Sequence, residues 1–248
     1  SYGDPAIANQ RLWIFKPLDI AAGEKRPCVF FIHGGGWGGK PELLAPQCLY
    51  LQRRGFNAVS IHFRSPGNGL TPRDTLDDAR KAYRWILEHA DEHHIDKNLI
   101  FISGGSAGGH LSLALRTIEF DSAGPDSPEA AGLILFNPVI DLVNGWSGGR
   151  KKCLQAKIEP RDFSPAHHVR AGLPPILILS GSRDSLIPPS LIREFQKRLA
   201  AVGGQSKFIE YPDAGHGFFN YGREENQYFQ WTMWEVENFL QSQLRSTK

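Results

Sequence analysis

One serine in the chain stands in a setting that exposes a nucleophile. Ser106 lies within the segment GGSAGGH (104–110), between the apolar run 99–103 and a helical pattern over 107–116. Glycine on both sides suits a sharp turn from strand into helix, because the backbone is strained there and a Cβ would crowd the turn and the substrate. An ordinary helix N-cap, a position that serine favours, is the alternative interpretation.

Two further residues could activate this serine. A serine hydroxyl is a weak nucleophile at neutral pH, and it needs a base such as an imidazole held in one tautomer by a carboxylate. His216 stands between two glycines after the apolar run 207–211, and Asp184 follows the apolar run 175–181. These residues are therefore the candidate general base and its orienting acid, and a simple turn histidine is the alternative for His216.

A glycine-rich segment could stabilise the charge that ester or amide cleavage creates. The apolar run 28–32 ends in HGGGWGG (33–39). Backbone N–H groups aimed at the carbonyl oxygen stabilise its negative charge, and glycines allow that close approach. We expect one donor in the region of Gly35 and Gly36, either of which could supply it, and the other at Ala107, directly after the nucleophile. His33 is expected to support this loop rather than to act as a second base.

Four segments carry a resemblance to a known family: HGGGW, GGSAGGH, SRDxxIP and AGHGF, in this order between residues 33 and 218. With them the chain resembles α/β-hydrolases of the esterase and lipase group, close to the hormone-sensitive-lipase-like enzymes. It is also similar to small bacterial esterases that act on acetylated or feruloylated plant polysaccharides. The order Ser106, Asp184, His216 is that of this fold and excludes the chymotrypsin and subtilisin arrangements.

The resemblance implies a serine carboxylesterase that works without a cofactor or a metal ion. Only about thirty residues precede HGGGW, whereas lipase-like relatives carry a longer amino-terminal cap, so a deep lidded acyl tunnel is not expected. A formamidase or another amide hydrolase is the alternative, because the same groups cleave both bonds. A non-catalytic hydrolase-fold binding protein is a third possibility, since fold alone does not fix function.

The orienting carboxylate has two competitors in the sequence. Asp141 follows the apolar run 132–139, and Asp213 lies three residues before His216. Asp184 is preferred because it follows the strand that normally precedes the strand of the histidine in this fold. Asp141 is the reserve candidate.

The pattern of the whole chain predicts an α/β fold in one domain over residues 1–248. Apolar runs alternate with helical patterns, which indicates a mostly parallel central sheet covered by helices on both faces. Strands are expected at 28–32, 57–63, 99–103, 132–139, 175–181 and 207–211, with an edge strand at 11–15. Helices are expected at 42–54, 73–90, 107–116, 189–201 and 224–244.

Residues 141–170 form the least patterned part of the chain. In the family that the chain resembles, insertions at this point commonly form the cap, and we expect a small one here that leaves the site open. Such a site suits short acyl groups on a bulky alcohol, for example acetyl or feruloyl groups on a carbohydrate. Trp37 and Phe218 flank the site in sequence and are candidates for its walls, with core packing the equal alternative.

The composition of the chain limits the classes of partner that we expect it to bind. The 248 residues carry a formal net charge of +2 and 41% apolar residues, which implies neither nucleic acid nor an anionic membrane as a partner. A small-molecule or polysaccharide ester is the expected substrate. No run is long enough to span a bilayer and no signal peptide is seen at Ser1, where methionine is missing, so the compartment stays open between cytoplasmic and secreted.

Cysteines and histidines outside the motifs do not suggest a metal site. Cys28, Cys48 and Cys153 are too few and too scattered for a disulfide scaffold or a zinc site. Five of the histidines outside the motifs are expected at a solvated helix end or in a loop, and they are His89, His93, His94, His167 and His168.

Overall fold

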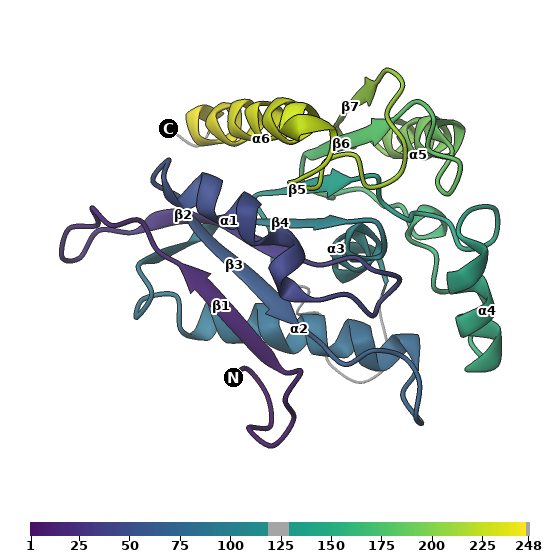
Figure 1. Ribbon diagram of the computed structural model, residues 1–248, viewed down its shortest axis with the longest axis horizontal. Coiled ribbons are helices and arrows are strands. Elements are labelled where there is room, and N and C mark those ends of the chain that lie inside the picture. The colour runs from purple at the N-terminus through teal and green to yellow at the C-terminus, as the bar shows by residue number, and fades with distance from the viewer. Residues whose placement is uncertain (119–128, 247–248) are drawn as a thin grey trace.

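A computed structural model describes residues 1–118 and 129–246, which form one seven-stranded sheet (Figure 1). The strand order is β1-β3-β2-β4-β5-β6-β7. β1 pairs with β3 in antiparallel fashion, and all other neighbours are parallel. The expected parallel sheet with an edge strand at 11–15 is therefore confirmed. The strands are β1 (Arg11–Phe15), β2 (Arg26–Ile32), β3 (Asn57–His62), β4 (Ile95–Gly105), β5 (Gly132–Phe136), β6 (Ile176–Gly181) and β7 (Ser206–Tyr211).

Helices cover both faces of the sheet (Figure 1). Buried side chains of α1 and α6 belong to one apolar cluster, whereas those of α2, α3 and α5 belong to another, so each set covers its own face. The helices are α1 (Ala45–Gln52), α2 (Pro72–Glu88), α3 (Ala107–Thr117), α4 (Ser147–Gln155), α5 (Pro189–Ala201) and α6 (Gln227–Ser246). Short 3-10 turns are η1 (Pro41–Leu44), η2 (Pro165–His167) and η3 (Glu224–Asn226). None of the described helices is long and apolar enough to cross a membrane.

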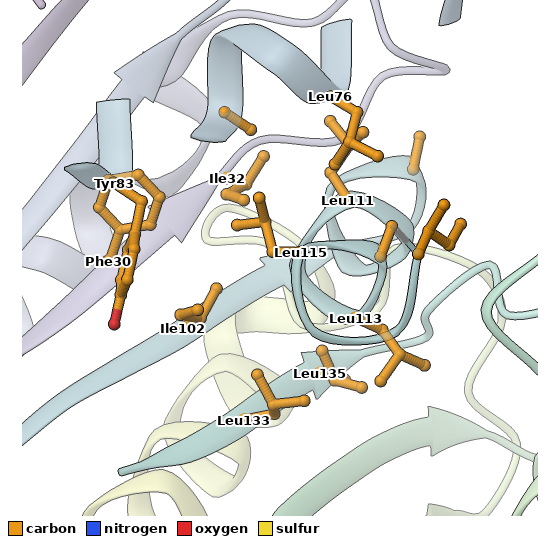
Figure 2. Packing of buried hydrophobic residues seen from close by; sticks show 14 of the residues in the cluster. Phe30, Ile32, Leu76, Tyr83, Ile102, Leu111, Leu113, Leu115, Leu133 and Leu135 are labelled. Atoms are coloured by element: carbon orange, nitrogen blue, oxygen red, sulfur yellow. The ribbon is translucent and has the colours of Figure 1, made fainter. Parts of the chain in front are cut away.

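The core has two layers because the central strands are buried on both sides. In β2, Phe30 and Ile32 belong to one cluster and Val29 and Phe31 to the other, as the alternation of a strand requires. Figure 2 shows the first layer, in which residues of β2, β4 and β5 meet leucines of α3 and the side chains of α2. The ring of Tyr83 packs edge-on against Phe30, with 5.2 Å between centroids. Such two-sided burial explains why these strands read as continuous apolar runs.

Two helices begin at other residues than the sequence predicted. The helix expected over 42–54 is divided into η1 and α1, because prolines stand in the first turn of both segments and favour a new helix start. The helix expected over 224–244 starts only at Gln227, because the three residues of η3 have left-handed φ angles of 45° to 65°.

Further corrections concern the centre of the chain. The strand expected over 132–139 ends at Phe136, where Asn137 takes a φ of 33° and Pro138 follows. The region 141–170 contains α4, which was not expected because two glycines and few apolar residues weaken its helical pattern. This helix stands apart from the two covering layers, on the side toward which β4 and β5 point (Figure 1).

Candidate active site

The turn between β4 and α3 holds Ser106 in a strained conformation. Its φ is 56° and its ψ is −121°, a region that residues with a side chain rarely occupy. The N–H of Ser106 donates to the carbonyl of Phe136 at 2.9 Å, and the N–H of Val139 donates to the carbonyl of Ser106 at 3.1 Å. Hydrogen bonds from the neighbouring chain after β5 therefore hold the serine in place.

The glycines of the turn are required by close backbone contacts. A Cβ at Gly104 would lie 2.7 Å from the carbonyl oxygen of Ile32, and one at Gly108 would overlap that same oxygen. A Cβ at Gly108 would also lie 2.6 Å from the carbonyl oxygen of His33. The turn 104–108 around Ser106, called the elbow below, thus packs directly against the end of β2, where the glycine-rich loop begins.

Ser106, His216 and Asp184 form a continuous hydrogen-bonded chain. His216 Nε2 lies 2.8 Å from Ser106 Oγ, and His216 Nδ1 lies 2.8 Å from Asp184 Oδ2. The Asp184 side chain is fully buried, and its other oxygen accepts the backbone N–H groups of Leu186 at 3.0 Å and Ile187 at 2.8 Å. The carboxylate is thereby fixed to receive the Nδ1–H of the imidazole, leaving Nε2 free to accept a proton from the serine.

The loop that bears His216 is fastened to the sheet. The N–H of Gly217 donates to Asn137 Oδ1 at 3.1 Å, and Arg223 donates to the carbonyl of His216 at 3.1 Å. Asn137 in turn donates its own N–H to Leu179 of β6 at 2.6 Å. The imidazole is therefore held by contacts with the ends of β5 and β6.

The two competing carboxylates lie elsewhere. Asp141 accepts hydrogen bonds from Val143 N at 2.7 Å and Asn144 Nδ2 at 2.9 Å, and it faces His167 at 3.5 Å. Burial acts to raise the pKa of Asp141, but these hydrogen bonds outweigh it and hold the pKa below its usual value. Asp213 is exposed and pairs with Arg183 at 2.5 Å.

The glycine-rich loop after β2 turns through consecutive left-handed residues. Gly35, Gly36 and Trp37 have φ angles of 73°, 63° and 66°. A bulky residue such as tryptophan is a clear outlier there. In the described part of the chain, the N–H groups of Gly35, Gly36 and Ala107 have no hydrogen-bond acceptor, so all three are free to bind an incoming oxygen.

A cavity of about 340 Å³ opens beside Ser106. Its lining includes Ser106 and the glycine-rich loop, and the other side chains are largely apolar, with His216, Asn220 and Arg223 as polar exceptions. The apolar wall residues are Leu43, Leu44, Trp146, Leu186 and Phe219. Such a volume is at the small end of ligand cavities, which run from roughly 300 to 1,000 Å³.

Trp37 and Phe218 do not line this cavity, which corrects the expectation that they form its walls. Trp37 is 0% exposed and packs edge-on against Trp146 and Phe163, with centroid distances of 4.9 and 5.9 Å. Phe218 is 3% exposed and contacts Tyr211, with 5.0 Å between centroids. Core packing, the equal alternative, describes both residues.

Sequence reasoning missed the aromatic residues that do reach the cavity. Trp146 comes from the region 141–170, and Phe219 directly follows Phe218, which was predicted to be a wall residue. A Cβ at Gly105 would overlap the Phe219 ring, so that ring lies on the elbow itself. One signal was available: a tryptophan among glycines at 145–149, in a segment where no core face was apparent.

Two buried imidazoles support the turns. His33 is stacked on Phe63, with 4.1 Å between centroids, and its Nδ1 lies 3.2 Å from the carbonyl oxygen of Gly34. His110, in α3, contacts the carbonyl oxygen of Phe163 through Nε2 at 2.7 Å. Burial lowers the pKa of both His33 and His110 from 6.5 to about 4, so both are uncharged at neutral pH.

No candidate for a metal centre emerges. Across residues 1–118 and 129–246 there is no group of three or more His, Cys, Asp or Glu side chains that could hold an ion. His89 and His94 instead contact the backbone oxygens of Trp85 and Glu24 at 2.9 and 3.0 Å. All three cysteines are buried and free.

Comparison with known proteins places the chain in a family. A family model for the alpha/beta hydrolase fold matches residues 29–220. The chain belongs to this family. Within it, the probable carboxylic ester hydrolase LipM of Mycobacterium tuberculosis is 32% identical over 242 residues, 88% of this chain and 55% of LipM. The acetylxylan esterase of Xylanibacter ruminicola is 27% identical over 179 residues, 68% of this chain and 36% of that protein.

Solved structures of this alpha/beta hydrolase family include close relatives. The propionate-bound esterase Est2 of Thermogutta terrifontis superposes with a TM-score of 0.84 at 35% identity, covering 93% of this chain and 88% of that one. Its butyrate-bound structure gives the same values. The chain spans about half the length of the curated relatives it matches first, of which it covers 55 to 58%. These relatives and structures are named as esterases or carboxylic ester hydrolases.

Proposed function

We propose that this chain is a serine carboxylesterase that hydrolyses short-chain acyl esters through an acyl-enzyme intermediate. The observation that carries the proposal is the hydrogen-bonded chain Ser106–His216–Asp184, with 2.8 Å at each step. Beside it lie three backbone N–H groups that have no acceptor among residues 1–118 and 129–246. The esterase names of the family members support the same chemistry.

In the proposed reaction, Ser106 Oγ attacks the ester carbonyl carbon while His216 Nε2 takes the hydroxyl proton. The carbonyl oxygen becomes an oxyanion that receives hydrogen bonds from the N–H groups of Gly35, Gly36 and Ala107. His216 then gives its proton to the departing alcohol, which leaves the acyl group on Ser106. Water, deprotonated by His216, attacks the carbonyl carbon of this acyl-enzyme, and the bond between the acyl group and Ser106 Oγ breaks. The carboxylic acid leaves while His216 returns the proton to Ser106 Oγ. Asp184 keeps the imidazole in the required tautomer throughout.

The walls of the cavity favour a short acyl group. A volume of about 340 Å³, bounded by Trp146, Leu186 and Phe219, suits acetate to butyrate better than a long fatty chain. The esterase Est2 has been solved with propionate and with butyrate bound, which supports this size class. Similarity to an acetylxylan esterase supports acetyl groups on a carbohydrate as natural acyl groups, whereas the feruloyl alternative rests on the sequence motifs alone.

Initial rates on a panel of esters test the proposal. The panel contains p-nitrophenyl acetate, butyrate, octanoate and palmitate beside acetylated xylan, methyl ferulate and N-formylkynurenine, with Ser106→Ala as the blank. We expect acetate and butyrate to be preferred and the blank to be lower by about 10⁴-fold or more. Preference for octanoate or palmitate would contradict the acyl size, and turnover of the formamide alone would assign the site to amide hydrolysis.

A further inference from the structure

One side chain of α4 reaches the glycine-rich loop 33–39, called the oxyanion loop below because its N–H groups are the proposed oxyanion donors. Lys152 Nζ donates a hydrogen bond of 2.7 Å to the carbonyl oxygen of Gly36, a residue 116 positions away in the sequence. Lys152 is half-buried, and burial lowers the pKa of its ammonium group. Within residues 1–118 and 129–246, no carboxylate forms an ion pair with it. The backbone oxygen of Gly36 is therefore its polar partner.

Trp146 completes this connection between α4 and the loop. Its indole covers Gly36, since a Cβ there would lie 3.3 Å from Trp146 Cζ2. On the helix side, a Cβ at Gly148 would lie 2.6 Å from Trp146 Nε1, and one at Gly149 would overlap the six-membered ring. Gly148 and Gly149, which weaken the helical pattern of α4, thus make room for the indole to pack against the helix. Lys152 follows one turn later in α4.

The oxyanion loop needs such support at Gly36 in particular. Its own backbone hydrogen bonds run from Gly38 N to Gly35 O at 3.0 Å and from Gly39 N to Gly34 O at 3.3 Å. In the described chain, the bond from Lys152 is the hydrogen bond that restrains the Gly36 backbone. Because glycine has no Cβ to limit its dihedral angles, an unrestrained Gly36 samples many conformations. Its N–H would then point away from the oxyanion position in part of the population.

We propose that Lys152 is a positioning residue that fixes Gly36 for transition-state stabilisation. This inference rests on the proposed esterase function, in which the Gly36 N–H binds the oxyanion. Oxyanion donors act on charge that develops in the transition state, so a displaced donor slows the chemical step more than it weakens substrate binding. The region 141–170 then serves the site by holding the loop as well as by walling the cavity.

Four proteins test the inference with p-nitrophenyl acetate: wild type, Lys152→Met, Lys152→Arg and Lys151→Met. Lys151→Met is the matched control, because it removes the same charge from the next, exposed position of α4. We expect Lys152→Met to lower kcat by about tenfold or more while KM stays within about twofold, since small misplacements of a catalytic group cost up to about 100-fold. Lys152→Arg keeps the charge and the N–H donors and should recover much of kcat.

Either of two results would overturn the inference: equal kcat values for Lys152→Met and Lys151→Met, or a raised KM with an unchanged kcat. Thermal unfolding of each variant shows whether the fold is intact. Should Lys152→Met fail to fold, the shorter and uncharged Lys152→Gln replaces it in the same comparison. Failure of the esterase proposal is a separate result, namely a wild-type rate equal to that of Ser106→Ala.

Discussion

The turn at Ser106 and the glycine-rich loop 33–39, which are the proposed nucleophile elbow and the proposed oxyanion loop, follow the carboxyl ends of the adjacent strands β4 and β2, yet they are held differently. At the elbow, backbone meets backbone, as in the contact of Gly108 with the carbonyl of Ile32. The glycine-rich loop has close backbone contacts at Gly34, Gly35 and Gly39, but Gly36 is held by two side chains of the region 141–170. These are the ammonium group of Lys152 and the indole of Trp146. The turn at Ser106 is therefore fixed by its own residue types, whereas the loop depends at Gly36 on a distant segment.

The first prediction concerns stability and compares one glycine from each turn. Gly108→Ala should lower the free energy of unfolding by about 3 kcal/mol and abolish most activity, because its Cβ has only fixed backbone to displace. Gly38→Ala is the control in the oxyanion loop, where a Cβ meets its nearest atoms at 3.7 Å and φ is not left-handed. Urea denaturation measures the free energy of unfolding of both variants, and kcat measures their activity. Similar losses in the two variants would remove the contrast between the turns.

The second prediction uses the uncharged imidazole in each turn. Burial lowers the pKa of His33 and of His110 from 6.5 to about 4. Between these values the unfolded chain binds protons that the folded chain does not, so the free energy of unfolding falls as the pH falls. Acidification from pH 7 to pH 5 should cost about 2 kcal/mol for each imidazole.

Urea denaturation at both pH values, on wild type and on the variants His33→Gln and His110→Gln, isolates these contributions. Each variant should be less stable at pH 7 but lose less stability on acidification. An unchanged loss in His110→Gln would show that this imidazole binds protons equally in the folded and the unfolded protein, which would contradict its uncharged state in the folded protein at pH 5.

The third prediction concerns Trp146 as a wall of the cavity. Trp146→Ala enlarges the cavity beside Gly36 and removes the indole that covers it. We expect the ratio of kcat/KM for octanoate over acetate esters to rise about tenfold, since changes in pocket size are worth roughly 1 to 3 kcal/mol. Leu154→Ala is the control, because Leu154 is an exposed apolar residue of α4, the helix that directly follows Trp146. An unchanged ratio would mean that Trp146 does not limit the acyl group.

The same contrast explains how much the sequence could reveal. The elbow requires glycines at fixed offsets from Ser106, so its pattern is local and readable. His216 and Asp184 follow strands of a parallel sheet, whose carboxyl ends lie at one edge. The fold therefore brings both residues to Ser106, as the sequence predicted. The central strands were also predictable, because burial on both faces leaves continuous apolar runs.

The support of the oxyanion loop could not be predicted in this way. No local rule connects Lys152 with Gly36 across 116 positions, and α4 has too weak a helical pattern to suggest a helix there. Trp37 was placed at the cavity because of its neighbours in the motif, but its left-handed φ of 66° turns the side chain into the core. The wall position belongs to Trp146, which tertiary packing alone brings to the loop.

The most direct test of the account is to identify which residue a fluorophosphonate modifies, by peptide mass spectrometry of the folded protein. Such reagents react with a serine that is activated by a base beside an oxyanion site. The account predicts a single adduct on Ser106 in the wild type, much slower labelling in His216→Gln, and none in Ser106→Ala. An adduct on another residue, or no adduct on folded wild-type protein, would contradict the assignment of Ser106 as the nucleophile.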